Sequence, residues 1–151
     1  VCAMWNKDHS IRLSVFFTRL FLGLLALGLF VVPGIAAFFV AVTQKPPVVV
    51  TAISAAFYLC AGPAALLLWY LDRLLGSLSR GEVFTWENIS RLRRISWCCG
   101  AVAVICLGAA WFFFPFLLVS AAGAFMSLIL RVIKNVFQEA LALKEENDST
   151  I

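Results

Sequence analysis

Long stretches without a charged residue are the feature that most constrains the fold of this chain. Residues 20–42 and 48–71 contain no Lys, Arg, Asp or Glu, and neither do residues 95–130. A helix of the 23 residues from 20 to 42 is about 35 Å long, which exceeds the roughly 30 Å hydrocarbon core of a bilayer. Such stretches cannot form a surface that faces water, so we predict that they cross a membrane.

The stretch from 95 to 130 is too long for a single crossing, because its 36 residues exceed the roughly 20 that one crossing needs. Pro115 disfavours a continuous helix there, so we expect the chain to reverse near residues 111–116. The sequence therefore predicts an all-α fold in which one domain, residues 1–151, forms an integral membrane four-helix bundle. The approximate spans are 18–42, 48–71, 95–113 and 116–134.

The basic residues indicate how these spans are oriented. The net charge of +4 would suggest nucleic-acid binding in a soluble protein, but eleven of the twelve Lys and Arg residues lie in segments 7–19, 73–94 and 131–144. Cytoplasmic loops carry an excess of Lys and Arg, and only Lys45 lies on the other side. We predict both termini in the cytoplasm and no direct nucleic-acid binding.

The start of the chain has one competing interpretation. A signal peptide would also have a basic beginning and an apolar run, and Gly34-Ile35-Ala36 has the small-residue pattern of a cleavage site. The apolar run continues past that point to Val42, and a further apolar segment follows it, so we prefer a first membrane span. Met4 is an alternative start of the natural chain.

The segment between the second and third spans is predicted to be a cytoplasmic amphipathic helical hairpin. Leucines at positions 71, 74, 75 and 78 recur at helical spacing, and Gly81 is a natural stop. Thr85 is a good N-cap for a new helix that leads into the third span. The fourth helix is expected to leave the membrane near Arg131 and Lys134, and an apolar stripe at helical spacing, from Ile133 to Leu141, predicts a helical C-terminal cytoplasmic extension.

Small residues repeat at four-residue spacing in the second and fourth spans: Ala52 with Ala56, Ala61 with Ala65, Ser120 with Ala124, and Gly123 with Ser127. Small residues let two helices approach closely in lipid. We therefore expect close helix packing at such pairs, although chance accounts for some of them in so alanine-rich a chain.

The residues needed for enzyme chemistry are missing from the apolar segments. All eight acidic residues lie in the predicted cytoplasmic segments, so no carboxylate is available within the membrane for proton transfer or catalysis. The adjacent Cys98 and Cys99 lack the second pair of ligands that a zinc site needs, and His9 is the only histidine. We predict no enzyme activity, no catalytic residues, no metal and no cofactor.

The inner hairpin concentrates charged, turn-forming and aromatic residues, and it holds the candidate binding residues. These are Arg80, Glu82, Phe84, Glu87, Asn88, Arg91, Arg93 and Arg94. One interpretation is attraction to anionic lipid headgroups, to which each basic residue contributes about 1 kcal/mol. The other is a docking surface for a cytoplasmic protein.

The same residues carry a family resemblance. The chain resembles the bacterial membrane family catalogued as domain of unknown function 2975, from about residue 14 onward. The resemblance rests on residues 80–85 (Arg-Gly-Glu-Val-Phe-Thr), 87–88 (Glu-Asn), 91–95 (Arg-Leu-Arg-Arg-Ile) and Trp97, and on the ending 145–151 (Glu-Glu-Asn-Asp-Ser-Thr-Ile). The family usually has leucine where this chain has Ser149. The resemblance implies four membrane helices and a frequently adjacent gene for a short helix-turn-helix DNA-binding regulator, but no established activity.

From these observations we predict a non-enzymatic, multi-pass protein of the bacterial cytoplasmic membrane. Its expected task is that of a regulatory or sensory partner, which contacts the lipid bilayer and binds the small helix-turn-helix regulator at its inner face. One alternative is a homo-oligomer that serves as a small-solute transporter or channel-like subunit. The other is a structural or accessory membrane protein.

Overall fold

Four long helices account for most of the chain. The computed structural model describes residues 2–150, with side chains described for residues 8–150. The helices are α1 (Cys2–Thr43), α2 (Pro47–Ser79), α3 (Trp86–Ala109) and α4 (Pro115–Ser149). Each contains a segment that is long and apolar enough to cross a membrane, with a mean hydropathy of 1.5 to 2.5. The predicted all-α fold with four membrane helices is confirmed.

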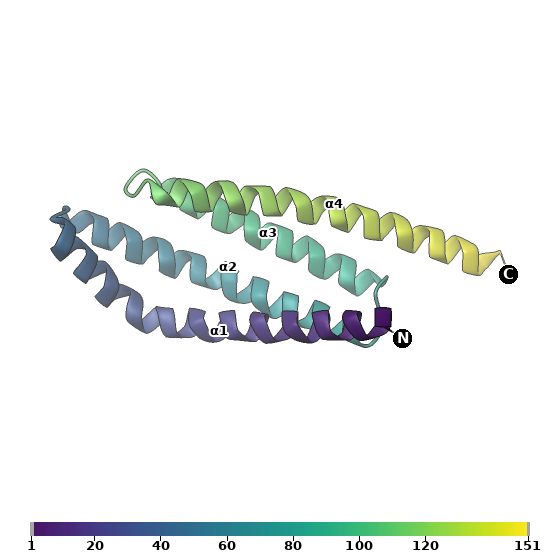
Figure 1. Ribbon diagram of the computed structural model, residues 1–151. Helices are drawn as coiled ribbons and strands as arrows, with labels where there is room; N and C mark the ends of the chain where they lie inside the picture. The colour runs from purple at the N-terminus through teal and green to yellow at the C-terminus, as the bar shows by residue number, and fades with distance from the viewer. Residues whose placement is uncertain (1, 151) are drawn as a thin grey trace.

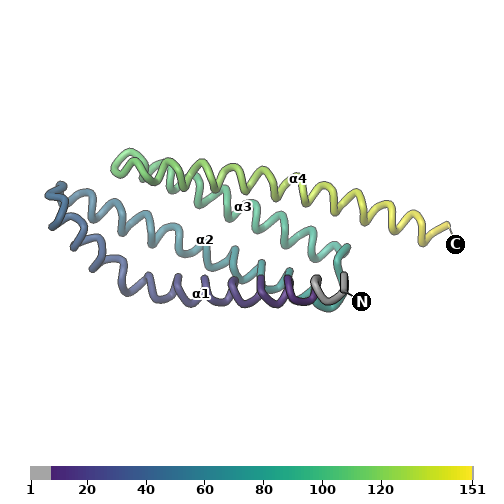
Figure 2. Tube along the Cα trace, in the orientation of Figure 1, coloured from purple at the N-terminus to yellow at the C-terminus, as the bar shows by residue number. Residues whose placement is uncertain are grey.

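The helices run in alternating directions and pack in chain order. α1 packs on α2, α2 on α3 and α3 on α4, whereas α1 and α4 do not pack on each other within residues 2–150. Figure 1 shows α2 and α3 between α1 and α4, with both ends of the chain at the same end of the molecule, and the trace in Figure 2 follows the same path. The bundle is therefore open along the side where α1 and α4 face each other.

Prolines begin two of the helices. Pro47 is the first residue of α2 and Pro115 is the first residue of α4, a position where the missing N–H costs nothing. The chain reverses between α3 and α4 at residues 110–114, which overlaps the predicted reversal at 111–116. α3 ends at Ala109, so the predicted third span, 95–113, extends into the turn.

α1 bends in its C-terminal half, as Figure 1 shows, and Pro33 lies inside the helix. Proline removes a backbone donor and its ring crowds the preceding turn, so a bend is the expected result. The bend brings the end of α1 towards the turn between α3 and α4, where the ring of Phe39 lies 5.7 Å from that of Phe113.

Small residues bring α3 and α4 together, as the four-residue spacing predicted. Ser120 Oγ donates a hydrogen bond to the carbonyl oxygen of Ala103 at 2.7 Å. Ser96 and Ser127 each donate from Oγ to the carbonyl oxygen of the other, both at 3.0 Å. At Gly123 an added Cβ would lie 3.3 Å from the Cβ of Ala103. The two backbones therefore approach so closely that only a small side chain fits between them.

We predict that Gly123→Leu destabilises the protein, because a leucine side chain would push α4 away from α3. The expected loss is about 1–3 kcal/mol of the free energy of unfolding, the usual cost of overpacking. Thermal unfolding in mild detergent, followed by circular dichroism, measures it. Gly23→Leu is the matched control, because no atom lies within 4 Å of an added Cβ there. Equal stability of the two variants would contradict this packing.

Candidate functional site

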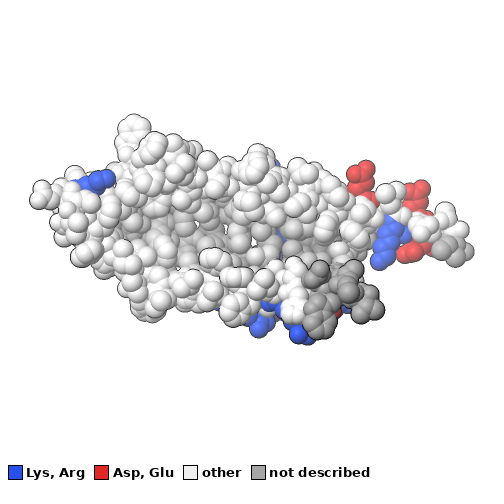
Figure 3. Space-filling view, viewed as in Figure 1, with Lys and Arg blue, Asp and Glu red and all other residues white. Residues whose placement is uncertain are grey.

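Charged residues gather at one end of the molecule. On the face shown in Figure 3 most of the charged side chains lie in the half towards the end that holds both termini, and a blue side chain also marks the opposite end. We call the end that holds both termini, which includes the loop 80–85 between α2 and α3, the charged end. The apolar middle is widely exposed, with Phe30 86% and Phe38 71% accessible. Surfaces of this kind suit lipid, and they support a multi-pass membrane protein.

The loop 80–85 is held in one conformation by hydrogen bonds. Gly81 has a φ of +82°, which allows α2 to end in a sharp turn. Ser77 Oγ donates to the carbonyl oxygen of Glu82 at 3.1 Å. Thr85 caps α3 as predicted, because its Oγ1 accepts a hydrogen bond from the backbone N–H of Asn88 at 3.3 Å. The loop is thus an ordered structure and not a flexible linker.

Asn88 is the centre of this loop, and its placement differs from the sequence prediction. Its side chain is fully buried, so it cannot belong to a surface that binds a partner. Its Nδ2 donates to the carbonyl oxygens of Glu82 at 2.7 Å and Val83 at 3.0 Å. Its Oδ1 accepts a hydrogen bond from Arg91 at 3.0 Å. Asn88 therefore joins the loop to α3.

Two contacts join the C-terminal arm of α4 to this loop and to the start of α3. The sequence left open whether the acidic end 144–148 pairs with the arginine-rich loop or is solvated, and it did not indicate these two partners. The ring of Phe84 packs edge-on against the ring of Phe137, with centroids 5.2 Å apart. Trp86 Nε1 donates a hydrogen bond to Oε1 of Glu145 at 3.0 Å. We call the surface formed by residues 82–87 and 137–148 the loop–arm surface.

The predicted arginines do not all lie together. Arg91, whose side chain is 20% exposed, pairs with Glu87 at 3.5 Å, and Arg80 approaches Glu82 at 3.9 Å. Arg94 faces α2, where it donates to Tyr70 Oη at 2.9 Å. Arg93 lines a different hollow with Arg131, Lys134 and Trp97. The candidate residues are therefore spread over several faces of α3 and its loop.

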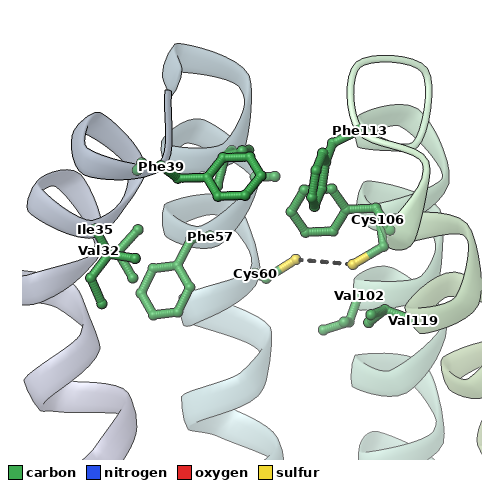
Figure 4. A pocket seen from close by; sticks show the side chains of 13 residues that line it. Val32, Ile35, Phe39, Phe57, Cys60, Val102, Cys106, Phe113 and Val119 are labelled. Carbon is green, nitrogen blue, oxygen red and sulfur yellow. Dashed lines mark hydrogen bonds between the residues drawn. The ribbon is translucent and has the colours of Figure 1, made fainter. Parts of the chain in front are cut away.

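A second feature is an apolar hollow in the other half of the molecule, between α1 and α4. A cavity of about 400 Å³ is lined by phenylalanines from three helices and the α3–α4 turn, and it includes Cys60 and Cys106. Figure 4 shows Phe39, Phe57 and Phe113 around it, with the two sulfur atoms 3.9 Å apart. Within residues 8–150 no three His, Cys, Asp or Glu side chains are grouped as metal ligands would be.

The family described as Protein of unknown function (DUF2975) matches residues 30–151. The chain belongs to this family. The match begins later than the expected residue 14, and it includes the end of α1, all of α2, α3 and α4, and so the entire loop–arm surface of this DUF2975 protein. Comparisons with curated proteins and with solved structures find no match to the chain.

We predict that Asn88→Asp loosens the loop of this DUF2975 protein. Aspartate keeps the oxygen that accepts from Arg91 but removes both donors, and it places a carboxylate beside two carbonyl oxygens. A buried polar group left unpaired costs about 1–3 kcal/mol, so opening of the loop should become about 5-fold to 150-fold more frequent. The rate of tryptic cleavage after Arg80, followed by mass spectrometry in detergent, measures the opening.

The control for this experiment is Asn147→Asp, which makes the same chemical change at an exposed position of the arm. Cleavage after Arg80 should then proceed at the wild-type rate. If Asn88→Asp also leaves that rate unchanged, Asn88 does not hold the loop.

Proposed function

We propose that this protein is a non-enzymatic regulatory protein of the bacterial cytoplasmic membrane, with the charged end in the cytoplasm. There the loop–arm surface binds the small helix-turn-helix DNA-binding regulator that the family resemblance implies. The orientation is supported by the distribution of basic residues, since eleven of twelve belong to segments at the charged end. Binding at the membrane would lower the concentration of regulator that is free to reach DNA.

The observation that carries this proposal is the attachment of the α4 arm to the loop. Phe84 with Phe137, and Trp86 with Glu145, hold two segments that are more than fifty residues apart in one surface. A free tail would have to be ordered when a partner binds, which costs conformational entropy. A surface that is already assembled avoids most of that cost.

The charge and exposed apolar area of the loop–arm surface fit a DNA-binding partner. Its arm exposes four carboxylates, Glu139, Glu145, Glu146 and Asp148. Trp86 is 55% exposed and Leu143 is 63% exposed, and aromatic side chains are enriched at protein interfaces. DNA-binding proteins carry Lys and Arg on the face that contacts phosphates, so an acidic surface complements that face. In this arrangement the membrane protein and DNA compete for the regulator.

The transporter alternative receives less support. Transport of a polar solute needs polar or ionisable groups along a path near the middle of the membrane. The hollow of this chain is lined by apolar side chains and two cysteines, so a path would have to arise between several copies. A structural or accessory role predicts no capture of the regulator, so the capture experiment decides between that role and the proposal.

We predict that the detergent-solubilised protein captures the regulator encoded beside it. The double variant Glu146→Lys/Asp148→Lys should bind about tenfold more weakly, because each reversed charge replaces an attraction of up to about 1 kcal/mol with a repulsion. Biolayer interferometry with immobilised membrane protein measures the affinity, and the weakening should diminish at high salt.

Lys45→Glu serves as the control, because it reverses a charge in the α1–α2 turn at the opposite end of the molecule. Its affinity for the regulator should equal that of the wild type. Failure of the wild-type protein to capture the regulator, or equal affinity of the double variant, would overturn the proposal.

A further inference from the structure

Arginines from three helices converge on a second face of the charged end, which meets the loop–arm surface at Glu87. Two adjoining hollows lie there, of about 470 and 540 Å³, and both include Trp69, Arg73 and Arg91. Together they are lined by six arginines: Arg12, Arg19, Arg73, Arg80, Arg91 and Arg94. The acidic residues in their lining are Asp72 and Glu87, which leaves an excess of four positive charges.

Three of these guanidinium groups are positioned by uncharged side chains. Arg73 lies over the ring of Trp69, 5.2 Å from its centroid. Arg94 donates to Tyr70 at 2.9 Å. Arg91 donates to Asn88 at 3.0 Å and also pairs with Glu87 at 3.5 Å. Among the described side chains Arg73 and Arg94 form no ion pair within 4 Å. The positive charges of Arg73 and Arg94 are therefore held in place but not neutralised, so both remain available to bind an anion.

The hollows lie where polar and apolar surfaces meet. Trp69 is near the end of the uncharged stretch 48–71, at a level typical of the membrane interface. Leu66 lies two helical turns from Arg73 on the same face of α2, towards the membrane, and is 50% exposed. On α1, Leu22 lies two helical turns from Val15, which lines the larger hollow, and Leu22 is 40% exposed. A ligand here would have its negative group among arginines and its apolar part along exposed leucines.

We propose that these two hollows bind the headgroup of an anionic phospholipid, with phosphate contacting Arg73, Arg91 and Arg94. Arginine suits this task because its planar fork forms paired hydrogen bonds to phosphate oxygens. Each hollow contains at least three arginines, so a lipid with two phosphates, such as a diphosphatidylglycerol, occupies both. The site meets the loop–arm surface at Glu87 but includes none of the carboxylates of the α4 arm, and it does not depend on binding of the regulator.

The site goes beyond general attraction of basic residues to an anionic membrane. General attraction depends on the number of charges near the surface and not on their arrangement. The proposed site depends on Arg73 and Arg94 in particular, and Arg73 was not among the residues that the sequence singled out. The two explanations therefore predict different results when equal numbers of charges are removed from different places.

The test measures lipid binding to the delipidated full-length protein in detergent, by native mass spectrometry. Diphosphatidylglycerol should bind more tightly than phosphatidylglycerol, and phosphatidylcholine at least about tenfold more weakly than either, since its headgroup has no net charge. The variant Arg73→Gln/Arg94→Gln should lose at least about tenfold in affinity for diphosphatidylglycerol. Equal binding of anionic lipids and phosphatidylcholine would overturn the proposal.

The matched control is Arg131→Gln/Lys134→Gln, which removes two positive charges from the separate hollow beside Trp97. This variant should keep wild-type affinity for diphosphatidylglycerol. An equal loss in both double variants would overturn the site and leave only general charge attraction. Millimolar inorganic phosphate should not displace the lipid, and displacement would overturn the assignment to a lipid by indicating a soluble phosphate ligand.

Two further measurements separate this site from folding and from the proposed function. The thermal unfolding temperature of the wild type in detergent should rise when diphosphatidylglycerol is added. That rise should be absent in Arg73→Gln/Arg94→Gln, whatever the unfolding temperature of this variant is without added lipid. A rise equal to that of the wild type would contradict the site. Glu146→Lys/Asp148→Lys should retain wild-type lipid binding, so that a failure to bind the regulator leaves this inference intact.

Discussion

The hydrocarbon around the helices is the constraint on which the rest of this structure depends. In lipid each backbone N–H and C=O must be paired within the protein, so a spanning segment has to be helical. Burial of apolar side chains adds little driving force there. Consistent with this, few apolar residues are buried in the spans, and α3 and α4 are joined by small residues and by the reciprocal hydrogen bonds of Ser96 and Ser127. Charges are confined to the ends for the same reason.

Features that depend on nearby residues could be predicted from the sequence. The uncharged stretches located the four helices, Gly81 located the end of α2, and Thr85 located the start of α3. Charge complementarity allowed the acidic end 144–148 to be considered as a partner of the arginine-rich loop, but the contacts of Phe84 with Phe137 and of Trp86 with Glu145 could not be predicted, because no local pattern identifies partners more than fifty residues apart. The burial of Asn88 was also missed, since a polar residue among charged neighbours resembles an exposed one.

The separation of the arginines could have been anticipated. Successive residues on a helix point about 100° apart, so Arg93 and Arg94 had to face different neighbours. Arg94 lies with Arg73 and Tyr70, whereas Arg93 lies with Arg131. The charged end thus has an acidic loop–arm surface and a basic interfacial face, and Asn88 contacts both, through the loop carbonyl oxygens and through Arg91.

The most direct test of this account asks on which side of the membrane the charged end lies. In a variant whose five native cysteines are replaced by alanine, a single cysteine is introduced as Lys45→Cys or as Glu82→Cys. Intact cells are then treated with a maleimide that does not cross membranes. The account predicts labelling at position 45, and labelling at position 82 only after the cells are opened. Labelling at position 82 in intact cells would contradict it.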